Sequence, residues 1–379
     1  MGFRAARGGT LARTRSFWFF FCRSDRKRTS ITKICYHLTM KRLSVGIIGL
    51  GYWGPNWLRN FAASEEWDLK YGCDLKKDRV EKFTRMYPAT SFTQNYTELL
   101  KDKSLDAVVI ATAADAHFGL AKKALEAGKH VLIEKPMTSS VREAKALVDL
   151  AKRKKRLLLV DHTFAYTSSV KKISEIVKGG SLGDLLYFDS TRINLGLIQP
   201  DTNVLWDLAI HDLTILASIV DLKKVTGVYA TGSHHFTKNV EDGHLHLKFN
   251  GGFAAHIHAS WLSPVKIRQT LVAGRKAMVT YDDTQPSEKI RLYDKGVDHD
   301  DTKPDPFFPK YRIGNILIPA VSLTEALAVE ASHFAACISG KEKPAVSGED
   351  GLRIVEILEA ADKSLEKSRT ISINETISN

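Results

Sequence analysis

The sequence lacks the features of several protein classes. No apolar run approaches the roughly 20 residues of a membrane-spanning helix, and the aromatic cluster at residues 17–22 is short and flanked by arginines. The four cysteines form no CxxC pair, which argues against a disulfide or zinc framework. The net charge of +12 is concentrated in residues 1–39, so the remaining chain has no basic stripe for nucleic acid. We therefore expect no membrane or nucleic-acid partner and a cytoplasmic location.

Residues 1–39 have a composition of their own, with nine basic residues, a single acidic one and no hydrophobic periodicity. An Arg- and Ser-rich, acid-poor segment is typical of a transit peptide, whereas a secretory signal needs a longer apolar region. The alternative is that translation starts at Met40 and that the upstream residues are a start-site error. Under either interpretation the segment cannot bury a core, and we expect it to be disordered.

From residue 43 onward, short β-branched runs alternate with helical patterns. This alternation is typical of βαβ units in a parallel sheet. It predicts a Rossmann domain over residues 40–162. The predicted strands are 43–49, 69–74, 107–111, 131–134 and 157–160, and the predicted helices are 53–61, 77–86, 116–127 and 141–152.

After about residue 163 the strands become longer and alternate in polarity, which indicates an antiparallel sheet. The fold class is therefore α/β: an N-terminal Rossmann domain with a parallel sheet and a C-terminal α+β domain, residues 163–379, with a large, mostly antiparallel open sheet. Residues 285–319 are expected to be irregular, and the last helices could pack back on the Rossmann domain. The predicted strands are 225–231, 244–249, 252–260, 267–272 and 278–281, and the helices are 169–177, 204–219, 323–339 and 351–367.

A glycine motif lies between the first predicted strand and the first helix. Gly49, Gly51 and Gly54 have the GxGxxG spacing, which permits a tight turn, a close approach of backbone to a pyrophosphate and close packing of helix on strand. We expect these glycines, with Tyr52 and Trp53 between them, to bind a dinucleotide.

The end of the second predicted strand bears on the choice of dinucleotide. Asp74 lies about twenty residues beyond the glycines, where an acid accepts hydrogen bonds from the adenosine ribose. This favours NAD. Lys76 and Lys77 follow at once and could accept a 2′-phosphate, so NADP is the less favoured alternative.

Two further groups suit proton chemistry. Lys135, in Glu134-Lys135-Pro136, follows a predicted strand at the end where parallel sheets bind ligands; the alternative is an ordinary solvated lysine. Asp207 and His211 are four residues apart in a helical pattern, so a carboxylate could orient an imidazole for acid–base work. The alternative there is a helix-stabilising pair on a solvated face.

Taken together, these motifs resemble the glucose-fructose oxidoreductase and inositol dehydrogenase family, written Gfo/Idh/MocA, over about residues 43–367. The resemblance implies proton transfer and substrate positioning by Lys135 and His211 with Asp207 nearby, and a Lys–Pro peptide that is commonly cis. It places Glu134 and Lys135 among the cofactor contacts. It also implies a homodimer or homotetramer assembled through the C-terminal sheet.

Finer resemblance links the chain to UDP-N-acetylglucosamine 3-dehydrogenases and related nucleotide-sugar enzymes. The stretches 51–56, 162–166 and 203–207 carry it. Residues 111–117 depart from the family pattern, which has a proline after the threonine. The expected contacts from this comparison and from polar positions near strands are Thr112 and His117 for the cofactor, and His162, Tyr166, Arg192, Asn194 and Asn203 for the substrate.

Four histidines fall on neighbouring predicted strands. If Phe249 pairs with Phe253, then His244, His246, His256 and His258 share one face of the sheet. Such a face could bind a metal, but it could equally be a wet interface. We assign no metal to the functional site.

The sequence thus predicts an enzyme that transfers a hydride between NAD and a ring carbinol of a small-molecule sugar or nucleotide sugar. An inositol, a free monosaccharide or a cyclic diol is an alternative substrate. A hypothesis of another class is a non-catalytic protein that senses a sugar or a dinucleotide.

Overall fold

The computed structural model describes residues 42–199, 202–298 and 310–377. The chain divides into the units Met1–Lys41 and Arg42–Asn379, and only the second is described below. The predictions for residues 1–39 and for residues 299–309 of the expected irregular stretch lie outside the described residues.

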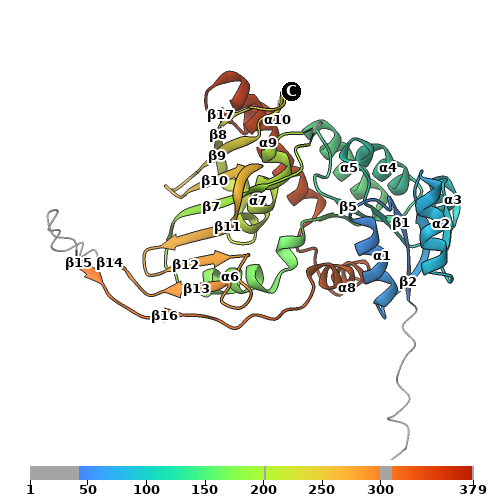
Figure 1. The fold of residues 1–379 in the computed structure, drawn as a ribbon, viewed down its shortest axis with the longest axis horizontal. Coiled ribbons are helices and arrows are strands. Elements are labelled where there is room, and N and C mark those ends of the chain that lie inside the picture. The colour runs from blue at the N-terminus through green and yellow to red at the C-terminus, as the bar shows by residue number, and fades with distance from the viewer. Residues whose placement is uncertain (1–41, 200–201, 299–309, 378–379) are drawn as a thin grey trace, which may run out of the picture. The chain divides into compact units, whose positions relative to one another are not determined.

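A six-stranded parallel sheet forms the first layer (Figure 1). Its strand order, β3-β2-β1-β4-β5-β6, is that of a Rossmann fold, and the predicted fold class is confirmed. The sequence analysis missed only β3 and α3. The elements are β1 (Leu43–Ile48), α1 (Gly54–Ala63), β2 (Trp67–Cys73), α2 (Lys77–Met86), β3 (Ser91–Thr93), α3 (Tyr96–Lys101), β4 (Ala107–Ile110), α4 (Ala114–Glu126), β5 (His130–Glu134), α5 (Val141–Lys154) and β6 (Leu158–Asp161).

Helices cover both faces of this sheet. On one face α1 lies against α8 (Ala326–Ile338), near the end of the chain (Figure 1). Trp67 stacks on Phe334 with ring centroids 5.3 Å apart, and its indole donates a hydrogen bond to the Ala331 carbonyl. The opposite face packs against α4 and α5. Because both faces are covered, inner strands such as β4 are apolar and buried, and polar groups collect where these strands end.

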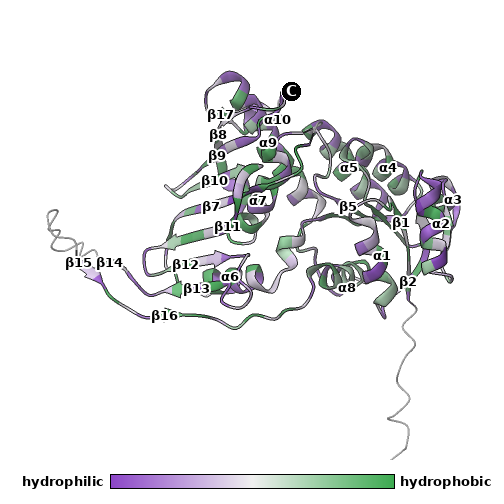
Figure 2. Cartoon of the chain, viewed as in Figure 1, coloured by the Kyte–Doolittle hydropathy of each residue, from purple (hydrophilic) through white to green (hydrophobic). Residues whose placement is uncertain are grey.

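The second sheet has nine strands in the order β16-β13-β12-β11-β7-β10-β9-β8-β17. Only the β7–β10 pair is parallel among its described pairings, so the predicted mostly antiparallel sheet is confirmed. Figure 2 shows hydrophobic and hydrophilic residues alternating along its strands. The strands are β7 (Leu185–Leu195), β8 (Val225–Ser233), β9 (Asp242–Phe249), β10 (Ala254–Ser260), β11 (Leu262–Gly274), β12 (Met278–Asp282), β13 (Ile290–Tyr293), β16 (Ile316–Leu317) and β17 (Ile371–Ser372).

Two expectations for this part are corrected. Strand β7 was not predicted, although it lies in the middle of the sheet. Residues 285–319 were expected to be irregular, but β13 and β16 within them extend the sheet by pairing at Leu292–Leu317 and Tyr293–Ile316. A separate two-stranded ribbon, β14 (Gly296–Asp298) with β15 (Lys310–Arg312), also lies in this stretch.

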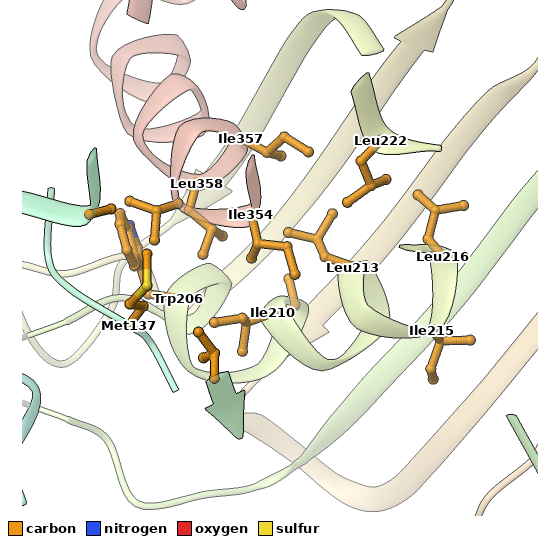
Figure 3. Packing of buried hydrophobic residues seen from close by; sticks show 14 of the residues in the cluster. Met137, Trp206, Ile210, Leu213, Ile215, Leu216, Leu222, Ile354, Ile357 and Leu358 are labelled. Carbon is orange, nitrogen blue, oxygen red and sulfur yellow. The ribbon is translucent and has the colours of Figure 1, made fainter. Parts of the chain in front are cut away.

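Helices cover one face of the nine-stranded sheet. A single π-helical turn (Leu205–Ala209) leads into α7 (Ile210–Ala217), which packs against α9 (Gly348–Lys367). Figure 3 shows Ile354 and Leu358 of α9 beside Ile210 and Leu213 of α7. The remaining helices are the 3₁₀ turns Thr163–Tyr166 and Leu222–Lys224, α6 (Ser168–Lys178) and α10 (Asn374–Ile377).

The segment after β5 joins the same core. Met137 lies next to Trp206 in Figure 3 and is almost completely buried. The Lys135–Pro136 peptide just before it is cis. The loop that carries Lys135 is therefore packed against the π-helical turn of the second sheet's helices. None of the described helices combines the length and the hydropathy needed to cross a membrane.

Candidate active site

At Gly49 and Gly54, the turn between β1 and α1 has no room for a side chain. Gly49 has a φ of +97°, and a Cβ there would lie 2.4 Å from the Ala111 carbonyl oxygen. A Cβ on Gly54 would lie 2.1 Å from the Gly49 carbonyl oxygen. The turn therefore holds the N-terminus of α1 close to the sheet at the point where the strand order reverses, which is where such sheets bind anionic ligands.

Two predicted cofactor residues lie on the outer side of this turn. Tyr52 is 82% exposed and Trp53 is 38% exposed. Their rings meet edge to face, with centroids 5.5 Å apart. Their contact with a dinucleotide stays a prediction, as does that of Thr112, whose methyl group lies next to Gly49.

Asp74 is bound to the turn itself. One carboxylate oxygen accepts hydrogen bonds from the Leu50 amide (2.8 Å) and from Arg79 (3.0 Å), and the other accepts from the Lys76 amide (2.9 Å). Burial alone would raise the pKa of Asp74, but these bonds lower it below its ordinary value. The sequence analysis missed Arg79, whose guanidinium also lies 3.5 Å from the position of a Cβ on Gly51.

A contact between Lys135 and Asp207 links the loop after β5 to the π-helical turn that precedes α7. The Lys135 ammonium donates hydrogen bonds to the Asp207 carboxylate (3.0 Å) and to the Asp207 carbonyl (2.9 Å). The second carboxylate oxygen of Asp207 accepts a bond from the buried Trp261 indole (3.0 Å). The two predicted residues are thus in contact. Trp261 was missed, and its place directly after β10 is the signal that could have found it.

The predicted Asp207–His211 pairing is corrected. The Asp207 carboxylate accepts hydrogen bonds from Lys135 and Trp261, and within the described residues none from His211. The π-helical turn at Leu205–Ala209 has a wider hydrogen-bonding pattern than an α-helix. A spacing of four residues therefore does not align the two side chains here, and Asp207 orients the lysine rather than the imidazole.

His211 is partly buried beside positively charged side chains. Its ring packs on Phe164 with centroids 5.2 Å apart. Burial, followed by the charges of Lys135 and Arg192, lowers the pKa of His211 well below its ordinary value of 6.5. The imidazole is therefore neutral at physiological pH. Within the described residues its ring nitrogens accept and donate no hydrogen bond, which leaves them available to a ligand.

Several predicted substrate contacts prove to be buried supports. Arg192 is 2% exposed, and its guanidinium is bound to the carboxylate of Asp212 at 2.6 and 3.1 Å. The buried His162 ring is hydrogen-bonded to the Thr214 hydroxyl, and burial lowers its pKa to about 3. In this structure both side chains have internal partners, and their contact with a substrate stays a prediction. Asp212, the partner of Arg192, was missed.

Three more predicted contacts have internal partners or are buried. Asn203 caps the π-helical turn through the Leu205 amide and donates a hydrogen bond to Asp362. Tyr166 is 1% exposed. His117 is buried, and its two ring nitrogens lie 2.8 and 3.2 Å from the Pro136 and Thr112 carbonyls. Contacts of these three side chains with a ligand stay predictions, as does that of Asn194, which is half-buried on β7.

A group of buried acids lies behind Lys135. Glu134 accepts a hydrogen bond from the Trp57 indole (2.9 Å) and is paired in the sheet with Asp161. Burial and the nearby Asp161 raise the pKa of Glu134 well above its ordinary value, and the same causes raise that of Glu330 on α8. These carboxyls therefore tend to hold protons. Glu134 is therefore part of this interior group, and its predicted contact with the cofactor stays a prediction.

The strand order, the glycine turn and the polar side chains at the end of β5 define a dinucleotide-binding α/β class. Comparison with known proteins specifies it further. The family model "Oxidoreductase family, NAD-binding Rossmann fold" matches residues 43–162, and the model "GFO/IDH/MocA C-terminal domain" matches residues 170–280. Together they cover more than half of the chain, which belongs to the Gfo/Idh/MocA family of oxidoreductases.

Two inositol dehydrogenases match this chain along nearly their whole length. Myo-inositol 2-dehydrogenase of Thermotoga maritima is 24% identical, over 88% of this chain and 100% of that protein. The scyllo-inositol 2-dehydrogenase (NADP⁺) of Bacillus subtilis is 22% identical, over 87% and 96%. The structure of UDP-N-acetylglucosamine 3-dehydrogenase from Acidithiobacillus ferrooxidans superposes with a TM-score of 0.73 at 21% identity, over 86% of this chain and 99% of that one, which is a likeness of fold.

Proposed function

We propose that this oxidoreductase transfers a hydride between NAD(H) and a ring carbinol carbon of a sugar or nucleotide sugar. One observation carries the proposal. Lys135, at the carboxyl end of β5, is held by Asp207 close enough to His211 for its charge to lower the pKa of that imidazole. A charged donor and a neutral acceptor therefore lie together where open parallel sheets bind their ligands.

The glycine turn supports the cofactor part of the proposal. The sites of the missing Cβ atoms on Gly49 and Gly54 are filled by backbone, and the N-terminus of α1 begins directly at the turn. Such a turn suits a pyrophosphate. When bound, the nicotinamide supplies the hydride acceptor for alcohol oxidation, or the donor for the reverse reaction.

The side chains can manage the hydroxyl proton. In oxidation, the neutral His211 ring accepts the proton from the carbinol oxygen. The Lys135 ammonium donates a hydrogen bond to the same oxygen and stabilises the negative charge that develops there. Asp207 and Trp261 keep the ammonium in position. In reduction the proton returns from the imidazolium to the oxygen.

A substrate panel tests this function. Purified full-length protein is mixed with NAD⁺ or NADP⁺ and with sugars, UDP-sugars, inositols and cyclic diols, and NAD(P)H absorbance is followed. We expect reduction with a sugar or UDP-sugar. Inositols are the second class to test, because two relatives are inositol dehydrogenases. Turnover of inositols alone would make an inositol the substrate in place of a sugar. Binding of dinucleotide without turnover of any compound would support the sensor hypothesis.

The cofactor preference has its own test. We propose NAD because Asp74 lies beside the turn, while Arg79 on the same carboxylate could instead contact a 2′-phosphate. Arg79→Ala should reduce kcat/KM for NADP⁺ by about tenfold, the loss of one charged hydrogen bond, with a smaller change for NAD⁺. Arg85→Ala on the same helix serves as control. A wild-type preference for NADP⁺ would contradict the proposal.

Assembly into a homodimer or homotetramer through the second sheet stays a prediction.

A further inference from the structure

The open face of the nine-stranded sheet carries a ladder of histidines. In the observed register His244 lies opposite His258, and His246 lies opposite His256. The residues between them, Leu245 among them, point into the core and are buried. The expectation that all four histidines share one face is confirmed. None of these four side chains takes part in the site at the end of β5.

One end of this ladder brings three potential ligands together. Asp242 and His244 are two residues apart on β9, so their side chains leave the sheet on the same side. His258 comes from the neighbouring strand, and its Nε2 lies 3.0 Å from the Asp242 carboxylate. One ligand atom from each residue lies within 4.8 Å of the others. In the described part of the chain, no other group of three His, Cys, Asp or Glu residues converges in this way.

The geometry of the two rings suits a shared cation. The His244 and His258 rings stack with centroids 4.2 Å apart and planes 10° apart. Each ring offers a nitrogen atom near the Asp242 carboxylate. Imidazole nitrogen and carboxylate oxygen are atoms that bind transition-metal ions.

We propose that Asp242, His244 and His258 bind a divalent transition-metal ion of the zinc type on the open face of the nine-stranded sheet. Two imidazoles and one carboxylate suit zinc rather than magnesium, which prefers oxygen ligands. Tetrahedral zinc needs its ligand atoms about 3.4 Å apart, since each bond is about 2.0–2.1 Å. The exposed His244 ring can close the remaining gap by turning. Three protein ligands leave a fourth position for water.

Hydroxyl side chains lie beside the three proposed ligands. Thr231 pairs with His244, and Thr191 pairs with His258, so hydroxyl groups flank both rings in the same cross-strand row. Ser260, opposite Asp242, is followed directly by Trp261, whose indole binds Asp207. A bound ion would therefore fasten together β9 and β10 at the strand ends next to the residue that orients Asp207.

Zinc binding to the full-length chain tests the proposal. Protein without a histidine tag is stripped with a chelator and titrated with Zn²⁺ against a chromophoric chelator. Co²⁺ is added in parallel, because tetrahedral Co²⁺ absorbs visible light. Wild-type protein should bind one more ion per chain than His244→Asn and His258→Asn, or bind it at least tenfold more tightly. Mg²⁺ should not compete.

The matched control is His246→Asn, which changes a histidine on the same strand and face outside the group of three. It should keep the wild-type stoichiometry and the Co²⁺ spectrum. Asp242→Asn provides a third variant that keeps both rings. Unchanged zinc binding in all three site variants, with NADH binding intact, would overturn the proposal. Equal loss in His246→Asn would assign the ion to a different set of ligands and overturn it as well.

Discussion

The two sheets place their polar side chains in different ways. In the parallel sheet β4 and β6 are buried throughout and β5 is buried except at His130, and the polar groups that suit catalysis lie where strands end, as Lys135 does. In the nine-stranded sheet β9 alternates between buried and accessible residues, so one whole face presents side chains to solvent. A sheet covered on both faces concentrates its chemistry at one edge, whereas a sheet with an open face can carry a binding surface along its strands.

The largest expected effect is at the edge of the parallel sheet. Lys135→Ala and His211→Ala should each lower kcat by about 10²–10⁴-fold, the usual contribution of a positioned acid–base group. NADH binding, measured by fluorescence, should remain nearly intact. His246→Asn, on the open face of the other sheet, should turn over like the wild type. Full activity in both Lys135→Ala and His211→Ala would show that the strand ends of the parallel sheet do not carry the catalytic groups.

The glycine turn gives the next largest effect. Gly54→Ala adds a methyl group 2.1 Å from the Gly49 carbonyl oxygen, so α1 must move away from the turn. The NADH dissociation constant should rise at least about tenfold, or about 1.4 kcal/mol. Gly119→Ala in α4 is the matched control, because nothing lies within 4 Å of its added Cβ. Equal NADH affinity in both variants would show that the turn does not approach the dinucleotide.

The buried Glu330, on the helix α8 that packs against the first sheet, gives a smaller, pH-dependent effect. Because burial raises the folded-state pKa of Glu330, its stabilising contribution is full below the ordinary value of 4.5 and is lost as pH rises through the folded-state pKa. Glutamine does not titrate, so Glu330→Gln should abolish this fall in the free energy of unfolding with rising pH. The fall amounts to about 1.4 kcal/mol for each tenfold difference in proton affinity between the folded and unfolded states. Urea unfolding across this pH range measures it. The exposed Glu126→Gln serves as control, and parallel pH profiles for wild type and Glu330→Gln would contradict the account.

The predictability of the fold differs between the two sheets for a physical reason. Strands buried on both faces, such as β4 and β5, are continuous apolar runs and were predicted closely. Strand β7 was missed because two of its inward-facing residues, Ser190 and Arg192, are polar. Their partner, Asp212, is buried on α7. Alternation fails as a signal when a buried ion pair replaces apolar side chains.

The site was predictable in part. Local spacing identified the glycines, Lys135, Asp207 and His211, because each belongs to a short motif. It failed for the Asp207–His211 pairing, since a π-helical turn changes which residues align. Polar residues such as Arg192 were placed in the substrate site because sequence alone does not show that Asp212 satisfies them inside the core.

The central claim is that Lys135 and His211 act on the same oxygen of the same substrate. A double-mutant cycle tests it most directly, with kcat/KM measured for the wild type, Lys135→Ala, His211→Ala and the double variant on the substrate found by the panel. Groups that act as a unit are strongly non-additive, so the double variant should be little slower than the slower single variant. If the two losses instead multiply, the residues act independently and the account is contradicted.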